Sequence, residues 1–118
     1  MSEERQLDRC SKCGFCNSVC PAFRSALAET VSPRGFTTMI DAQKPQKALY
    51  NCTLCKACTF ECPAKIDLQT DLRKARQELA ESGKETEANK IMIDNIRKHG
   101  NPFGEVKKGE KPKNLYCC

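Results

Sequence analysis

Apolar residues recur at helical spacing through the second half of the chain. The clearest case is the stretch "AKIDLQTDLRKARQELAESG", whose apolar positions share one helix face. These positions are Leu68, Leu72, Ala75 and Leu79. Asp67 is placed to cap the first turn of this helix, and Gly83 is placed to end it.

A second amphipathic pattern runs from Thr86 to His99, and its apolar side is formed by Ala88, Ile91, Met92 and Ile96. Basic residues at 97–98 and His99 suit the negative end of a helix, and Gly100 stops it. The stretch over 101–118 is rich in Gly, Pro and Lys, which is typical of a linker, and we place the linker-like tail at residues 105–118.

The stretch from 21 to 51 also predicts helices. Pro21 suits the first turn of a helix over "PAFRSALAET", and Ser32 suits the N-cap of another that starts at Pro33. "QKALYN" is a further short turn. No alternating pattern of a strand appears, so the predicted fold class is mostly α.

Two runs of cysteines repeat one spacing, and each run is followed at once by a proline. The runs are "CSKCGFCNSVCP", with Cys10, Cys13, Cys16 and Cys20, and "CTLCKACTFECP", with Cys52, Cys55, Cys58 and Cys62. The agreement of the spacing and of both prolines indicates a duplicated metal site.

The spacing is that of the ligands of two [4Fe–4S] clusters. Three thiolates come from a C-x2-C-x2-C loop, and in two-cluster ferredoxins the fourth cysteine of the run binds the other cluster. We therefore predict one cluster on Cys10, Cys13, Cys16 and Cys62, and a second on Cys52, Cys55, Cys58 and Cys20.

Zinc and a disulfide framework are the alternatives for ten cysteines in 118 residues. Structural zinc usually takes two C-x2-C pairs separated by a longer loop, whereas here a third cysteine follows at the same step. The polar N-terminus lacks the features of a secretory signal. We therefore expect a cytoplasmic location, where thiols stay reduced and disulfides are disfavoured.

The formal net charge of +5 changes little in this interpretation. Each oxidised cluster with its thiolates contributes about −2, so the protein with two clusters would carry about +1. Nucleic-acid binding therefore has little support. No stretch reaches the length of about 18 apolar residues that a membrane span needs.

Aromatic and apolar residues stand close to the cysteines in sequence, and these are Phe15, Val19, Phe23, Tyr50, Phe60 and Ile66. Apolar groups around a cluster tune its potential by excluding water. We interpret them as ordinary core rather than as a specific electron relay.

The chain resembles a known group of iron–sulfur subunits. It contains, in order, the first cysteine run, "SPRG" at 32–35, the second run and "GNPFG" at 100–104. This set is similar to the ferredoxin-like N-terminal part of the iron–sulfur subunits of glycolate oxidase, anaerobic glycerol-3-phosphate dehydrogenase and heterodisulfide reductase. The resemblance covers about residues 8–104.

The resemblance implies an α-helical ferredoxin domain over residues 1–104. It implies an electron-transfer subunit that relays single electrons between a flavoprotein partner and a second acceptor. Further iron–sulfur subunits are the other implied partners. The chain has no candidate nucleophile–base pair or phosphate loop, so we expect the reaction itself to occur on a partner.

Two alternatives remain at this stage. The chain could be the N-terminal fragment of a catalytic oxidoreductase, such as a disulfide-reducing subunit, because members of the group often continue into domains with Cys-Cys-Gly motifs. Here residues 105–118 end in Cys117 and Cys118 without the glycine. We interpret this segment either as a tail or as the start of a missing cysteine-rich domain. The other alternative is a small interaction domain held together by structural metal.

Overall fold

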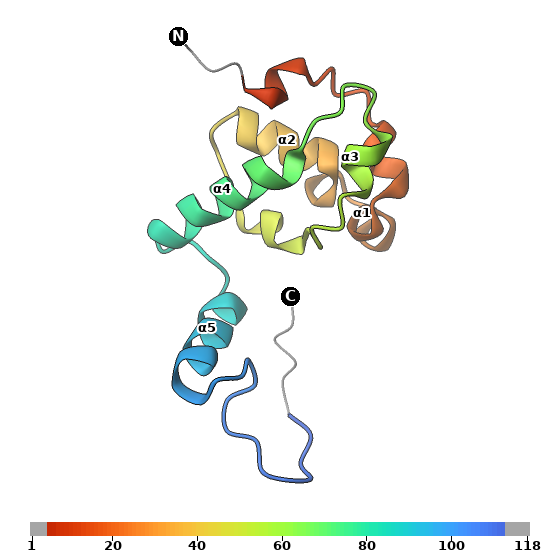
Figure 1. Cartoon of the computed structure of the whole chain (residues 1–118). Coiled ribbons are helices and arrows are strands. Elements are labelled where there is room, and N and C mark those ends of the chain that lie inside the picture. The colour runs from red at the N-terminus through yellow and green to blue at the C-terminus, as the bar shows by residue number, and fades with distance from the viewer. Residues whose placement is uncertain (1–4, 113–118) are drawn as a thin grey trace. The chain divides into compact units, whose positions relative to one another are not determined.

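The computed structural model describes residues 5–112, so Cys117 and Cys118 lie outside the described residues. The described chain contains the helices α1 (Pro21–Ala26), α2 (Pro33–Asp41), α3 (Ala57–Glu61), α4 (Leu68–Glu81) and α5 (Glu87–His99). It also contains the 3₁₀ helices η1 (Gln6–Arg9), η2 (Phe15–Val19), η3 (Glu29–Val31) and η4 (Lys47–Asn51). No residue of the described range lies in a strand, which confirms the mostly α fold class (Figure 1). None of its helices has the length and apolar character needed to cross a membrane.

Internal contacts divide the chain into two compact units, Met1–Lys84 and Glu85–Cys118. Both cysteine runs belong to the first unit. The sequence-based boundary at residue 104 stays a prediction, because a division by contacts does not test which segment the clusters require.

The core of the first unit is built on one face of α4, which lies against α2 (Figure 1). The four apolar positions predicted for this face are all buried, as Leu68, Leu72, Ala75 and Leu79. They join Leu7, Phe36, Leu49 and Ile66 in a single cluster. Each buried leucine or phenylalanine contributes about 1.5–3 kcal/mol, so this face fixes α4 against the segments that carry the cysteines.

Of the two N-cap residues predicted for α2 and α4, the structure confirms one. Ser32 caps α2 as predicted, because its Oγ accepts a hydrogen bond from the Gly35 amide at 2.9 Å. Asp67 stands at the N-cap of α4, but its side chain makes no capping bond to the backbone. Its carboxylate accepts instead from the Thr70 hydroxyl at 2.8 Å. The prediction that Asp67 caps this helix is therefore wrong.

The helix predicted over 21–30 is shorter in the structure. α1 ends at Ala26, and Leu27 takes a left-handed conformation with φ 50° at its C-cap. The chain then forms η3 before Ser32. This break places Glu29 beside the start of α2. A Cβ atom on Gly35 would lie only 1.9 Å from the carbonyl oxygen of Glu29.

The second unit is formed by α5 and the loop that follows it. Thr86 caps α5 by accepting from the Asn89 amide at 3.3 Å, and Gly100 ends it with φ 73°. The "GNPFG" loop returns to the helix, because the Asn95 side chain donates to the Pro102 carbonyl at 3.0 Å. No residue of α5 is fully buried, so its predicted apolar side is only partly covered within the described chain.

Candidate functional site

The two cysteine runs share a backbone conformation as well as a spacing. Lys12 and Leu54 stand before the second cysteine of their runs and have φ values of 57° and 58°. Gly14 and Lys56 follow that cysteine and have φ values of 83° and 65°. Because a left-handed residue other than glycine costs about 1–2 kcal/mol, its repetition at matching positions indicates one loop structure used twice.

The repeat extends beyond the cysteines on both sides. The 3₁₀ helices η1 and η4 precede the first and second run, and each buries a leucine three positions before the first cysteine, Leu7 and Leu49. η2 and α3 also occupy matching positions, because each begins one residue before the third cysteine of its run. These two short helices pack against each other, which brings the runs together.

One hollow collects cysteines from both runs. Cys10, Cys13 and Cys16 line it from the first run, and Cys62 lines it from the second. Cys13 is exposed, whereas the other three are partly buried. The hollow therefore groups the four residues predicted for one cluster, although the last is 46 positions away from Cys16 in the sequence.

The other four cysteines are also brought close to one another. Burial raises the pKa of the Cys52 thiol, and the nearby Cys20 and Cys55 raise it further as smaller effects. Burial likewise raises the pKa of Cys58, with smaller contributions from Cys52 and Cys55. Cys20 comes from the first run and is only 7% exposed.

Ionisation of the clustered thiols to thiolates is unfavourable unless a metal group compensates the charge. Burial raises the pKa of Cys16 to about 11, and the neighbouring Cys58, Cys10 and Cys13 add to this. By contrast, a hydrogen bond from the Phe15 amide lowers the pKa of Cys13. Thiolates so close together need a compensating cation, and binding a metal group to them releases protons.

The donor set fits iron–sulfur clusters. All eight cysteines of the two runs are free thiols, and thiolates are the ligands that hold such clusters. Within residues 5–112, no three His, Cys, Asp or Glu side chains converge on a position suited to a single metal ion. Cys10, Cys13, Cys16 and Cys62 line a hollow instead, which fits four thiolates around a cluster rather than around one ion.

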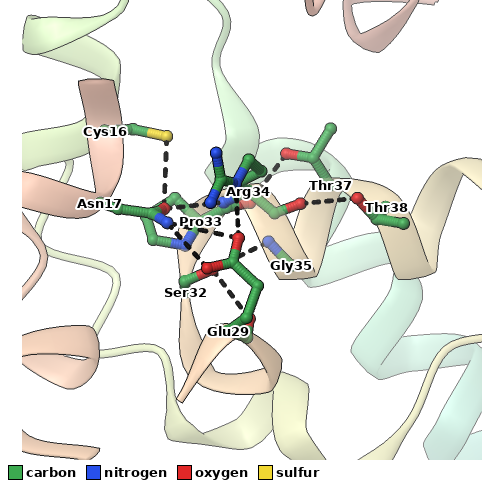
Figure 2. A network of polar contacts seen from close by, with 9 residues as sticks. All are labelled: Cys16, Asn17, Glu29, Ser32, Pro33, Arg34, Gly35, Thr37 and Thr38. Atoms are coloured by element: carbon green, nitrogen blue, oxygen red, sulfur yellow. Dashed lines mark hydrogen bonds and ion pairs between the residues drawn. The ribbon is translucent and has the colours of Figure 1, made fainter. Parts of the chain in front are cut away.

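A polar network beside the first run was not anticipated from the sequence. Asn17, which is buried, donates its side-chain amide to both oxygens of Glu29 at 3.3 and 3.2 Å. Its oxygen accepts from the Arg34 amide at 3.3 Å and from the Cys16 thiol at 3.8 Å. Figure 2 shows Asn17 between the Cys16 sulfur and the carboxylate of Glu29.

Arg34 completes this network. Its Nε lies 2.5 Å from Glu29, and its guanidinium lies close enough to Gly14 to line the hollow. Arg34 lowers the pKa of the Glu29 carboxyl, chiefly through their hydrogen bond. "SPRG" was the only sequence signal for this residue, because the pairing of Arg34 with Glu29 depends on the break after α1.

The interpretation of the aromatic residues near the cysteines as core is partly wrong. Phe15 is 62% exposed and Phe60 is 75% exposed, although Ile66 is buried. Phe15 stands on η2 and Phe60 on α3, the two short helices that carry the third cysteines of the runs. The two runs therefore present aromatic surface beside the cysteines.

Comparison with known families identifies the kind of domain. The sequence profile of the 4Fe-4S dicluster domain family matches residues 6–66, just over half of the chain. The chain belongs to this family. A dicluster domain carries two [4Fe–4S] clusters, which confirms the predicted cofactors.

Curated relatives include an iron–sulfur subunit of the group that the sequence resembles. The chain is 33% identical over 95 residues to the uncharacterized electron transport protein YkgF of Escherichia coli, covering 70% of this chain and 19% of the relative. It is 29% identical over 100 residues to the probable glycolate oxidase iron-sulfur subunit of Bacillus subtilis, covering 76% and 22%.

Lactate utilization protein B of Bacillus cereus is 36% identical over 88 residues, covering 68% of this chain and 19% of that protein. The chain thus spans about a fifth of the length of the curated relatives that it matches. The predicted resemblance to iron–sulfur subunits of the glycolate oxidase group is confirmed.

Proposed function

We propose that this chain is a two-cluster electron relay within a larger oxidoreductase. It would accept and release one electron at a time on each [4Fe–4S] cluster. The observation that carries the proposal is the single hollow that gathers Cys10, Cys13 and Cys16 with Cys62. Catalytic chemistry on a substrate would belong to a partner or to another domain, so the relay itself is not assigned a catalytic residue.

The proposed ligands follow the crossed arrangement. Cys10, Cys13, Cys16 and Cys62 would hold the first cluster, and Cys52, Cys55, Cys58 and Cys20 would hold the second. The nearness of Cys20 to Cys52, and of Cys62 to the first run, supports this arrangement. Bound clusters supply one-electron redox chemistry, and the surrounding residues orient them and limit their contact with water.

The proposed partners are a flavoprotein subunit and further iron–sulfur subunits. A flavin takes up two electrons from a substrate, and a relay of one-electron centres can pass them on singly. The names of two relatives, a glycolate oxidase iron-sulfur subunit and a lactate utilization protein, favour a small 2-hydroxy acid as the substrate oxidised upstream. A cytoplasmic location is part of the same proposal.

The second candidate is a fragment of a catalytic iron–sulfur protein of the disulfide-reducing type. The observation that favours it is that the chain spans only about a fifth of its relatives' length. Expression of the complete gene product and a search for a Cys-Cys-Gly domain in it would separate the two candidates.

The deciding experiment measures metal and redox activity together. Protein purified without oxygen should contain about eight irons and eight acid-labile sulfides per chain, the content of two four-iron clusters. Reduction with dithionite should then give the EPR spectrum of two coupled reduced clusters. Zinc, or fewer than about four irons without a reducible signal, would leave a structural metal domain and overturn the relay.

A further inference from the structure

The guanidinium of Arg76 is built into the segment that leads to the second cysteine run. Its Nε and Nη2 donate to the Leu49 carbonyl at 3.1 and 2.7 Å. Nη2 also donates to the carbonyl of Cys52 at 2.7 Å. The guanidinium carbon lies 5.3 Å from the centre of the Tyr50 ring. A positive charge is thereby held beside the first ligand of the second run.

This charge has no carboxylate partner within the described part of the chain. The ion pairs found there do not include Arg76, whose described hydrogen bonds end on neutral carbonyl oxygens. Burial lowers the pKa of Arg76, but an arginine starts so high that it stays charged at neutral pH.

Two cations beside the first run are paired with carboxylates instead. Arg34 is paired with Glu29 at 2.5 Å, and Lys12 is paired with Asp41 at 2.9 Å. Arg34 and Arg76 each stand fourteen positions after the last cysteine of a run, Cys20 and Cys62. Each half of the site thus carries one arginine at the same spacing. Of these two arginines, Arg34 is paired with a carboxylate and Arg76 is not.

We propose that Arg76 raises the reduction potential of the cluster held by the second run above that of the first, so that this cluster takes up the first electron. The inference rests on the proposed function. One electron from an external reductant changes a cluster with its four thiolates from about −2 to about −3, and no proton is required. An uncompensated, half-buried cation stabilises the added charge more than an ion pair does.

Burial of Cys20 acts in the opposite direction, because a buried site disfavours added charge. A substitution of Arg76 alone separates the effect of charge from that of burial. Arg76→Gln removes the charge and keeps hydrogen-bond donors, whereas Arg76→Lys keeps the charge. Arg73→Gln is the matched control, since Arg73 is exposed on the same helix.

The experiment is a redox titration followed by EPR on anaerobically purified protein and on the three variants, each first checked for iron and sulfide. Cys55→Ser and Cys13→Ser, made separately, assign each signal to a run, because a changed ligand alters the spectrum of its own cluster. We expect the second-run cluster to be reduced first. Arg76→Gln should lower its reduced-to-oxidised ratio at a fixed potential at least tenfold, which is 59 mV for one electron.

We expect Arg76→Lys to keep this ratio within about threefold of the original, and Arg73→Gln to do the same. The inference is overturned if both clusters are present and Arg76→Gln leaves their ratios unchanged, or if it moves only the first-run cluster. It is also overturned if the first-run cluster is reduced first in the unsubstituted protein, a measurement that needs no Arg76 variant. Absence of two reducible clusters in the unsubstituted protein would instead overturn the proposed function.

Discussion

A Cβ atom on Gly14 would lie 2.7 Å from Nη1 of Arg34. Lys56 occupies the matching position of the second run with a similar φ, 65° against 83°, and carries a full side chain. The left-handed backbone therefore does not by itself demand glycine in this loop. The close approach of Arg34 explains why the first run has glycine where the second has lysine.

Gly14→Ala should consequently weaken the first run. The new methyl group would displace the guanidinium of Arg34 and add the cost of a left-handed alanine, about 1–2 kcal/mol. Lys56→Ala is the control, since it removes an exposed side chain at the same conformation and should change stability by no more than about 0.5 kcal/mol. The measurement is the rate of iron release to a chelator, which should rise for Gly14→Ala alone; equal rates for the two variants would contradict this explanation.

Gly35→Ala should be the more damaging glycine substitution. Its Cβ would lie 1.9 Å from the Glu29 carbonyl oxygen, so the backbone of η3 or of α2 must move. We expect a loss of about 3 kcal/mol in the free energy of unfolding, at the upper end for overpacking. Thr38→Ala, at an exposed position of the same helix, should cost far less in chemical denaturation. A cost of under about 1 kcal/mol for Gly35→Ala would show that η3 does not constrain α2.

Asn17→Ala should destabilise the domain by about 1–3 kcal/mol. The substitution leaves the Arg34 amide and the carboxylate of Glu29 without the buried partner that now joins them. Ser18→Ala is the neighbouring control, because Ser18 is exposed and its hydroxyl bonds only locally to the Phe15 carbonyl. Urea denaturation under anaerobic conditions compares the two; a larger loss for Ser18→Ala would refute the role given to the network.

Cys62→Ser should alter the cluster of the first run, although Cys62 lies in the second. The reason is its place in the hollow with Cys10 and Cys16. Cys20→Ser should conversely alter the second cluster. EPR of each variant, compared with Cys13→Ser and Cys55→Ser as markers of the two runs, reads out which cluster has changed. If Cys62→Ser reproduced the spectrum of Cys55→Ser, each run would bind its own cluster and the crossed assignment would be wrong.

The sequence by itself determined the features that depend on local spacing. The face of α4, the cap at Ser32 and the start of α5 follow from short-range patterns, because a helix repeats every 3.6 residues and its ends need particular side chains. The same holds for the cofactors, since the spacing of the cysteines within each run reflects the geometry of a cluster.

Only the tertiary structure decided how distant segments meet. The pairing of Arg34 with Glu29 depends on the contact of α2 with η3, and the placement of the Arg76 charge depends on the contact of α4 with η4. The exposure of Phe15 and Phe60 is likewise set by how η2 and α3 pack. Such contacts join residues whose relative positions no periodic pattern encodes, because they are set by the whole core. Thus the kind of site can be predicted from the sequence, whereas the electrostatic difference between its two halves comes from the fold.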